Sequence, residues 1–192
     1  MTGKNHMLFG AALSFYVLPK LGISTNIITT AAASVGALVP DIDHPGSKIN
    51  KIMLPVKNRL GKMMIYSGIG SFLIYKYKGV NSLVFLGIIM IIIGLSHHRS
   101  FTHSILGTIL LSVVSFMVLQ NYLSYNLIIA FITGIISHLM ADYLTKQGIE
   151  LFYPVSNKNY KFFITFSSGG TAESLLSLIF IFMIIKNFLV SV

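Results

Sequence analysis

The sequence predicts an all-α protein built as a bundle of membrane helices, six or seven in number, with a short amphipathic helix at the membrane interface. Hydrophobic residues make up 54% of the chain and charged residues only 10%, a balance that excludes an ordinary soluble domain. Several apolar runs approach the roughly 18 residues that cross a bilayer. The chain has no cysteine, so a metal site would have to use His, Asp, Glu or carbonyl oxygen.

The candidate spans follow one another without a linker. The apolar runs lie at 6–20, 23–39, 63–75, 80–96, 104–119, 126–144 and 171–190. The first run has a basic start but no small-residue cleavage site, so we expect it to stay in the protein as a span. The third run is 13 residues long, which is short for a bilayer and leaves the count at six or seven. We expect one integral membrane domain over residues 1–192.

Two segments between the runs differ from the rest. Over 47–62, apolar residues repeat at helical spacing and basic residues occupy positions between them. This pattern predicts an interfacial amphipathic helix bent at Pro55. A solvated loop is the alternative for this segment. Residues 145–170 are mixed and rich in aromatic side chains, and we expect them to form a loop at the cytoplasmic face.

The basic residues predict the orientation. With seven spans and a cytoplasmic N-terminus, ten of the fourteen Lys and Arg residues fall inside and four outside, as the positive-inside rule favours. The net charge of +9 is clustered between apolar runs rather than in a basic arm. We therefore expect anionic membrane lipids as the partner and no nucleic acid. Because successive spans cross the membrane in opposite directions, every His-rich and Asp-rich motif falls on the cytoplasmic side. This predicts a single site there.

The stretch 137–145 carries one such motif at the end of a span. His138 and Asp142 are separated by four residues, so in a helix they share one face and could hold a divalent metal. The alternative is a core histidine paired with an aspartate.

The other motifs lie in turns. Asp41 and Asp43 stand two apart in a proline-bounded turn and could converge on one point or bond their own backbone. His98 and His103 straddle a turn, in which we expect Thr102 to cap the next helix. Arg99 could hold a phosphate or face lipid headgroups. The donors number seven, enough for two metals or for one metal and a general base: His6, Asp41, Asp43, His98, His103, His138 and Asp142.

Together these motifs resemble the YdjM family of bacterial inner-membrane proteins, which are described as membrane-bound metal-dependent hydrolases. The resemblance runs from about residue 5 to 175. It rests on Asn5-His6 with Phe9-Gly10, the turn at 40–47, His98-Arg99 with Thr102-His103-Ser104, Ser137-His138 with Asp142, Thr145, Gly148 and Tyr153-Pro154, and Ser168-Gly169-Gly170 before Glu173.

The resemblance implies chemistry as well as fold. The family is related to zinc-dependent phospholipase C and the single-strand-specific nucleases, which cleave phosphoesters with His/Asp-bound zinc. It implies one or two ions, zinc or manganese, with Asp43 as a ligand or as the base that takes a proton from water. We further expect Arg99 to act in catalysis, and Arg99 and Glu173 to bind substrate. The implied metal ligands are His6, Asp41, His98, His103, His138 and Asp142.

We therefore expect a hydrolase of the bacterial inner membrane that uses a metal-activated water to cleave a phosphoester in a lipid or lipid-linked substrate. Two other functions stay open. A divalent-metal transporter would need ligands near mid-bilayer and a polar path across the membrane. The only charged residues that the prediction places on the far side are Lys20, Lys76, Lys78 and Lys186. A non-enzymatic membrane partner could use a metal structurally.

Overall fold

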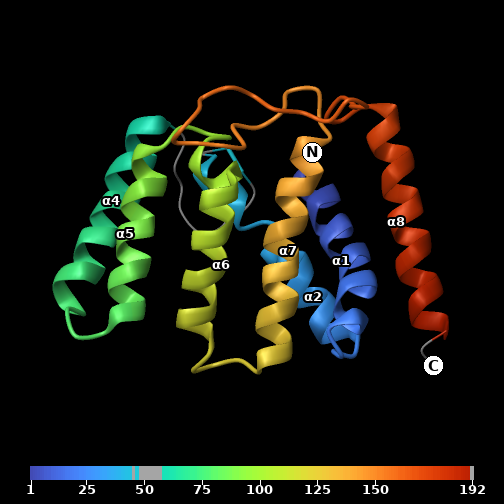
Figure 1. The fold of residues 1–192 in the computed structure, drawn as a ribbon, viewed down its shortest axis with the longest axis horizontal. Coiled ribbons are helices and arrows are strands. Elements are labelled where there is room, and N and C mark those ends of the chain that lie inside the picture. Colours follow the sequence, from blue (N-terminus) through green and yellow to red (C-terminus); the bar gives the residue numbers. More distant parts are fainter. Residues whose placement is uncertain (45, 48–57, 191–192) are drawn as a thin grey trace. The chain divides into compact units, whose positions relative to one another are not determined.

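The computed structural model describes residues 1–44, 46–47 and 58–190, and within them it contains α-helices and two short 3-10 turns. No β-strand longer than an isolated bridge occurs in these residues, so the all-α prediction is confirmed. The elements, coloured along the chain in Figure 1, are α1 (Gly3–Lys20), α2 (Ile27–Gly36), η1 (Pro40–Asp43), α4 (Arg59–Lys76), α5 (Asn81–Leu95), η2 (Phe101–His103), α6 (Ile105–Leu119), α7 (Tyr125–Tyr143) and α8 (Thr171–Val190).

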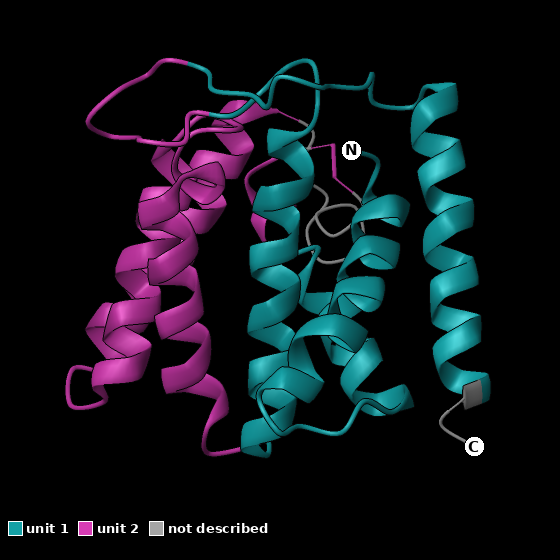
Figure 2. Ribbon diagram, turned by 45° about the vertical axis from the view of Figure 1, so that its right-hand side comes forward, with its two compact units in different colours: residues 1–39, 123–149, 159–192 teal, residues 40–122, 150–158 magenta. Residues whose placement is uncertain are grey.

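The chain forms two compact units, which interleave along the sequence (Figure 2). Unit 1 comprises residues 1–39, 123–149 and 159–192, and so contains α1, α2, α7 and α8. Unit 2 comprises residues 40–122 and 150–158, and so contains α4, α5, α6 and both 3-10 turns. Two of the four boundaries, at 149/150 and 158/159, fall in the long segment between α7 and α8.

In unit 1, α1 ends in a Schellman motif. Gly22 adopts a positive φ of 71°, which glycine reaches without a Cβ penalty. Its N–H donates to the carbonyl of Pro19, and the N–H of Ile23 donates to the carbonyl of Leu18 at 3.0 Å. Leu18 and Ile23 then pack with Ala130 of α7 in a buried cluster. The turn therefore anchors the end of α1 on α7.

Helix α2 packs closely against α7. It begins with a capping box, in which Asn26 and Thr29 each accept a hydrogen bond at 2.9 Å from the other's backbone N–H. Further along, a Cβ added to Gly134 of α7 would lie 2.7 Å from the nitrogen of Ala37 and 2.9 Å from the carbonyl carbon of Ala33. Only glycine permits this approach, as in other membrane helix pairs with small residues at the contact.

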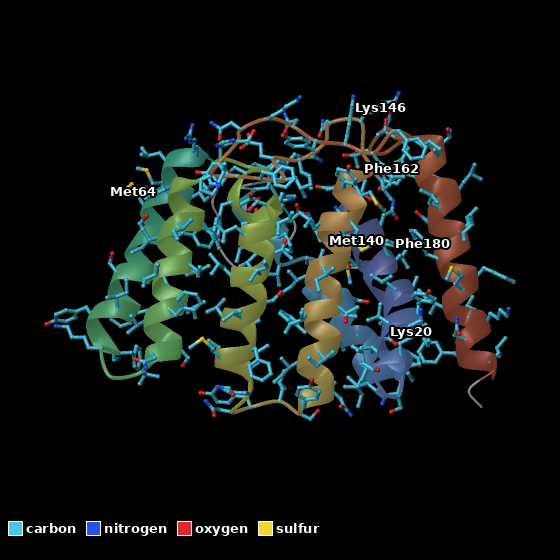
Figure 3. The ribbon with its side chains drawn as sticks, in the orientation of Figure 1. Lys20, Met64, Met140, Lys146, Phe162 and Phe180 are labelled. Carbon is cyan, nitrogen blue, oxygen red and sulfur yellow. The ribbon has the colours of Figure 1, made fainter. Side chains whose placement is uncertain are left out.

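Helix α8 packs on α1 through aromatic side chains. Phe180, labelled in Figure 3, lies against Phe9 with 5.1 Å between ring centroids. Near the other end of the pair, Phe15 and Phe188 meet edge to face at 5.0 Å. Many other large apolar side chains of α8 are exposed, as expected of a helix that faces lipid.

In unit 2, α4 and α5 form a tight antiparallel pair. A Cβ on Gly70 would lie 2.5 Å from the carbonyl oxygen of Gly87, and one on Gly87 would lie 2.7 Å from that of Gly70. The buried Lys62 in the first turn of α4 donates to the carbonyl of Ser96, which caps α5, at 2.6 Å. Ser104 caps α6 by accepting from the N–H of Gly107 at 2.9 Å. Thr102 was expected in that role, so this prediction was wrong.

The helices lie where the apolar runs predicted them, but only some of them are long enough to span a membrane. Among the described residues, α7 and the 171–189 part of α8 are long and apolar enough to cross a membrane, while α5 and α6 are apolar helices of 15 residues. Helix α2 has 10 residues, or about 15 Å of length, because Asn26 caps its start and a turn follows Gly36. The predicted span over 23–39 is therefore not confirmed, and the same holds for the total of six or seven spans.

The predicted interfacial helix over 47–62 lies mostly outside the described residues. Its last part belongs to α4, which begins at Arg59 rather than at the predicted residue 63. Asn58 caps this helix by accepting from the N–H of Gly61 at 2.7 Å.

Candidate metal centres

A first group of metal-capable side chains lies in unit 1, where the first residues of α1 meet the end of α7. His6 comes from α1, and His138 and Asp142 share one face of α7 because they are four residues apart. The rings of His6 and His138 stack with centroids 3.7 Å apart and planes 10° apart. One donor atom from each of the three residues lies within 4.8 Å of the other two.

A backbone carbonyl fixes the orientation of His138. Its Nδ1 lies 2.7 Å from the carbonyl oxygen of Ala37, at the end of α2. Because a carbonyl only accepts, Nδ1 must carry the proton, which leaves the lone pair on Nε2. That nitrogen is 3.8 Å from Oδ2 of Asp142. This is the arrangement by which proteins commonly orient a metal-binding histidine.

His6 lacks the hydrogen bonds that a buried imidazole needs. The residue is 1% exposed, and neither ring nitrogen has a hydrogen-bond partner. Leaving buried polar atoms unpaired costs about 1–3 kcal/mol each. Its Nε2 lies 3.3 Å from Oδ1 of Asp142, an oxygen that accepts a hydrogen bond from the amino group of Met1. A divalent ion bound at His6 would satisfy an imidazole nitrogen that the chain itself leaves unpaired.

Glu173 holds the start of α1 beside the start of α8. Its Oε1 accepts from the N–H of Thr2 at 2.7 Å and from the side-chain amide of Asn5 at 2.6 Å. Its Oε2 accepts from the N–H of Gly169 at 2.6 Å. Asn5 also accepts from the hydroxyl of Ser177, one turn further along α8, at 2.7 Å. Both carboxylate oxygens accept hydrogen bonds from groups of the protein itself. This geometry supports a structural role for Glu173; its predicted contact with substrate stays a prediction.

A second group lies in unit 2 and consists of Asp41 from η1, His98 and His103. One donor atom from each again lies within 4.8 Å of the other two. The Nε2 of His103 is 3.9 Å from Oδ1 of Asp41, and the rings of His98 and His103 meet edge to face at 5.2 Å. The side chains of His98 and Asp41 are 31% and 19% exposed. This group is therefore partly open, whereas the group in unit 1 is closed.

Asp43 lies beside this second group and is fully buried. Its Oδ1 accepts from Nδ1 of His98 at 2.8 Å, and its Oδ2 accepts from the hydroxyl of Thr102 at 2.6 Å and from the N–H of Arg99 at 3.3 Å. Burial raises the pKa of the Asp43 carboxyl, but its interactions with His103 and His98 outweigh burial and hold the pKa well below its usual range. Asp43 is therefore an ionised carboxylate whose oxygens are occupied by donors of the protein.

Arg99 occupies a strained backbone position between these residues. Its φ is +68°, a conformation that costs a side-chain-bearing residue roughly 1–2 kcal/mol. Two hydrogen bonds fix it: its N–H donates to Asp43, and its carbonyl accepts from the N–H of Glu150 at 3.2 Å. The backbone of Arg99 therefore helps to build the second group, whatever its guanidinium binds.

Two residues of unit 2 were not singled out from the sequence. Glu150 is buried and accepts from Nε2 of His97 at 2.7 Å. The ring of His44 lies 4.5 Å from the ring of His98, and burial, followed by the nearby charge of His98, lowers the pKa of His44. The short sequence distance between His44 and Asp43 could have drawn attention to His44, but nothing local to Glu150 signals its partner 53 residues away.

Six of the seven predicted metal ligands thus gather in two groups of three, one in each unit, and Asp43 stands behind one group. Imidazole nitrogen with carboxylate oxygen is a donor set that suits zinc or manganese. The fold and these groups define a class: an all-helical membrane protein with His/Asp clusters capable of binding divalent metal.

The chain belongs to the YdjM inner membrane protein family, whose model matches residues 1–191. It is 29% identical over 155 residues to the uncharacterized protein YvsG of Bacillus subtilis, which covers 80% of this chain and 74% of that protein. It is 23% identical over 165 residues to the inner membrane protein YdjM of Escherichia coli and equally to that of Shigella flexneri, covering 80% of this chain and 66% of each relative. No solved structure matches the chain. Family membership and the two candidate spans identify a membrane protein.

Proposed function

We propose that this protein is a metal-dependent hydrolase that cleaves a phosphoester in a lipid or lipid-linked substrate at the cytoplasmic face of the bacterial inner membrane. The observation that carries the metal assignment is His6, which is buried beside His138 and Asp142 with neither ring nitrogen in a hydrogen bond. A protein seldom buries an imidazole in this way unless a ligand completes it.

The partly exposed group in unit 2 is the better candidate for the reacting centre. A substrate must reach the bound ion, and His98 and Asp41 keep part of their side chains accessible. His6 and His138 are 1% and 0% exposed. The unit 1 group therefore suits an ion that is held permanently, as in structural metal sites.

The residues of unit 2 have separable roles in this proposal. Asp41, His98 and His103 would hold the ion, and an ion so held supplies a water of lowered pKa and a positive charge for a phosphate oxygen. The guanidinium of Arg99 would bind a substrate phosphate, for which its planar donors are well suited. Lysines on the segment after α7, such as Lys146 in Figure 3, would attract anionic headgroups.

The complete burial of His6, His138 and Asp142 favours one second candidate, a non-enzymatic membrane protein with a structural metal. The two candidates differ in unit 2. If the metal is only structural, replacing His98 should change stability and leave no activity to lose.

The test is hydrolysis by the purified protein in liposomes, supplied with zinc or manganese. Phosphatidic acid, phosphatidylglycerol and a water-soluble phosphodiester would be offered, with release of phosphate or diacylglycerol from the lipids, and of the alcohol from the phosphodiester, as the readout. We expect turnover of at least one lipid, lost on chelation and in His98→Ala. The matched control is His97→Gln, because His97 lies outside both groups and is half exposed. Metal-loaded protein that turns over none of these substrates would contradict the proposal.

A further inference from the structure

We infer that Asp43 is a positioning residue that places the proton of both His98 and His103 on Nδ1, so that each ring presents its Nε2 to a metal. This inference rests on the proposed metal site in unit 2 and assigns Asp43 neither of the roles that the sequence suggested for it, a ligand or a base. Asp43, His98, Thr102 and His103 form a chain of hydrogen bonds in which the donor and the acceptor of each contact are fixed.

The first link joins Asp43 to His98. Their contact, Nδ1 to Oδ1, is 2.8 Å long, and a carboxylate, the ordinary form of an aspartate side chain near neutral pH, can only accept. The proton therefore sits on Nδ1 of His98, and the lone pair sits on Nε2. Because Asp43 is fully buried, water cannot replace it in this contact.

The second link reaches His103 through Thr102. The Thr102 hydroxyl lies 2.6 Å from Oδ2 of Asp43 and must donate its single proton there. The same hydroxyl oxygen lies 2.8 Å from Nδ1 of His103. Having given its proton to Asp43, it can only accept from this nitrogen. His103 is thereby set in the same tautomer as His98, and its Nε2 is the nitrogen on the side of Asp41.

The same arrangement occurs in unit 1 with a different acceptor. There the carbonyl of Ala37 holds the proton of His138 on Nδ1. Three histidines, two from the segment between α5 and α6 and one from α7, thus direct their Nδ1 proton toward an acceptor of the protein. A carboxylate or carbonyl behind a histidine fixes its tautomer and raises its basicity as a ligand.

This chain of bonds predicts what an isosteric change does. Asp43→Asn replaces one acceptor oxygen by an NH₂ donor. If the NH₂ faces His98, the ring must accept on Nδ1 and carry its proton on Nε2. If it faces Thr102, the hydroxyl turns to donate to His103, which then carries its proton on Nε2. In either orientation at least one histidine loses the lone pair that a metal needs.

The experiment reads the tautomers directly. Long-range ¹H–¹⁵N correlation spectra of histidine-labelled, metal-free protein in detergent would be recorded for the wild type, Asp43→Asn, Thr102→Val and Thr102→Ser. We expect Nδ1–H at His98 and His103 in the wild type, and Nε2–H at one of them in Asp43→Asn. Thr102→Val should release His103 alone, and Thr102→Ser should keep the wild-type state because it keeps the hydroxyl.

Zinc titration supplies the second readout, in a His138→Gln background that removes a ligand of the unit 1 group. Asp43→Asn and Thr102→Val should weaken zinc binding about 10- to 100-fold, with Thr102→Ser close to the wild type. Nε2–H at His98 in the wild type, or unchanged tautomers and affinity in Asp43→Asn, would overturn the inference. A wild type that shows the expected tautomers but binds no zinc would support the role of Asp43 and contradict the proposed function.

Discussion

Gly134→Ala should separate α2 from α7 and disturb His138 at a distance. The added Cβ would lie 2.7 Å from the nitrogen of Ala37 and 2.9 Å from the carbonyl carbon of Ala33, whereas carbon atoms pack best at about 3.5–4.0 Å. The helices must therefore move apart by on the order of 1 Å. Such a shift would break the 2.7 Å bond from Nδ1 of His138 to the carbonyl of Ala37.

The expected free energy combines three effects. Overpacking costs about 1–3 kcal/mol, and leaving the His138 donor unpaired costs about 1–3 kcal/mol. The better helix propensity of alanine returns about 1 kcal/mol. We expect Gly134→Ala to lower the free energy of unfolding by about 3 kcal/mol, with these three effects as its sources.

The assay is denaturant unfolding in detergent micelles, followed by circular dichroism. Gly68→Ala is the matched control, because it also lies in a helix but has no atom within 4 Å of the new Cβ. It should be neutral or more stable by up to about 1 kcal/mol. If Gly134→Ala shifts stability no more than Gly68→Ala does, the close contact between α2 and α7 is not as the structure has it.

Three further predictions test other parts of the account. Glu173→Gln should lower the free energy of unfolding by about 1.5–3 kcal/mol in the same assay, because an amide cannot accept all three hydrogen bonds of the carboxylate. The control is Ser174→Ala, at an exposed position of the same helix. Equal effects of the two substitutions would contradict the structural role of Glu173. Arg99→Gly should be more stable than Arg99→Ala by about 1 kcal/mol, since glycine tolerates the +68° φ of this residue; equal midpoints would speak against the strain. Removal of metal with a chelator should lower the thermal unfolding midpoint of the wild type, and added zinc should restore it; a midpoint that ignores both treatments would count against a bound ion.

The helices could be predicted because their signals are local. Every apolar run identified in the sequence corresponds to a helix of the structure, and the four-residue spacing of His138 and Asp142 correctly placed both on one face of α7. His6, at the start of α1, was also expected near the end of α7, and its ring stacks on that of His138. These are consequences of helical periodicity and chain direction, which a single sequence contains.

The partners of individual side chains could not be predicted in this way. Asp43 sits in a 3-10 turn, where no periodicity shows which way a carboxylate points, and its three donors lie 55 or more residues away. The carbonyl of Ala37 has no side-chain signal at all, yet it orients His138. The sequence around Glu173 likewise shows a carboxylate but not the backbone N–H groups that surround it.

The most direct test of the central claim is metal content per chain, measured by mass spectrometry on purified wild type and on Asp142→Ala. Asp142 contributes to the group in unit 1 that contains the unpaired His6. We expect one to two equivalents of zinc or manganese in the wild type and at least one fewer in the variant. No bound metal in the wild type after reconstitution would contradict a metal-binding role and make these histidines and aspartates structural polar contacts.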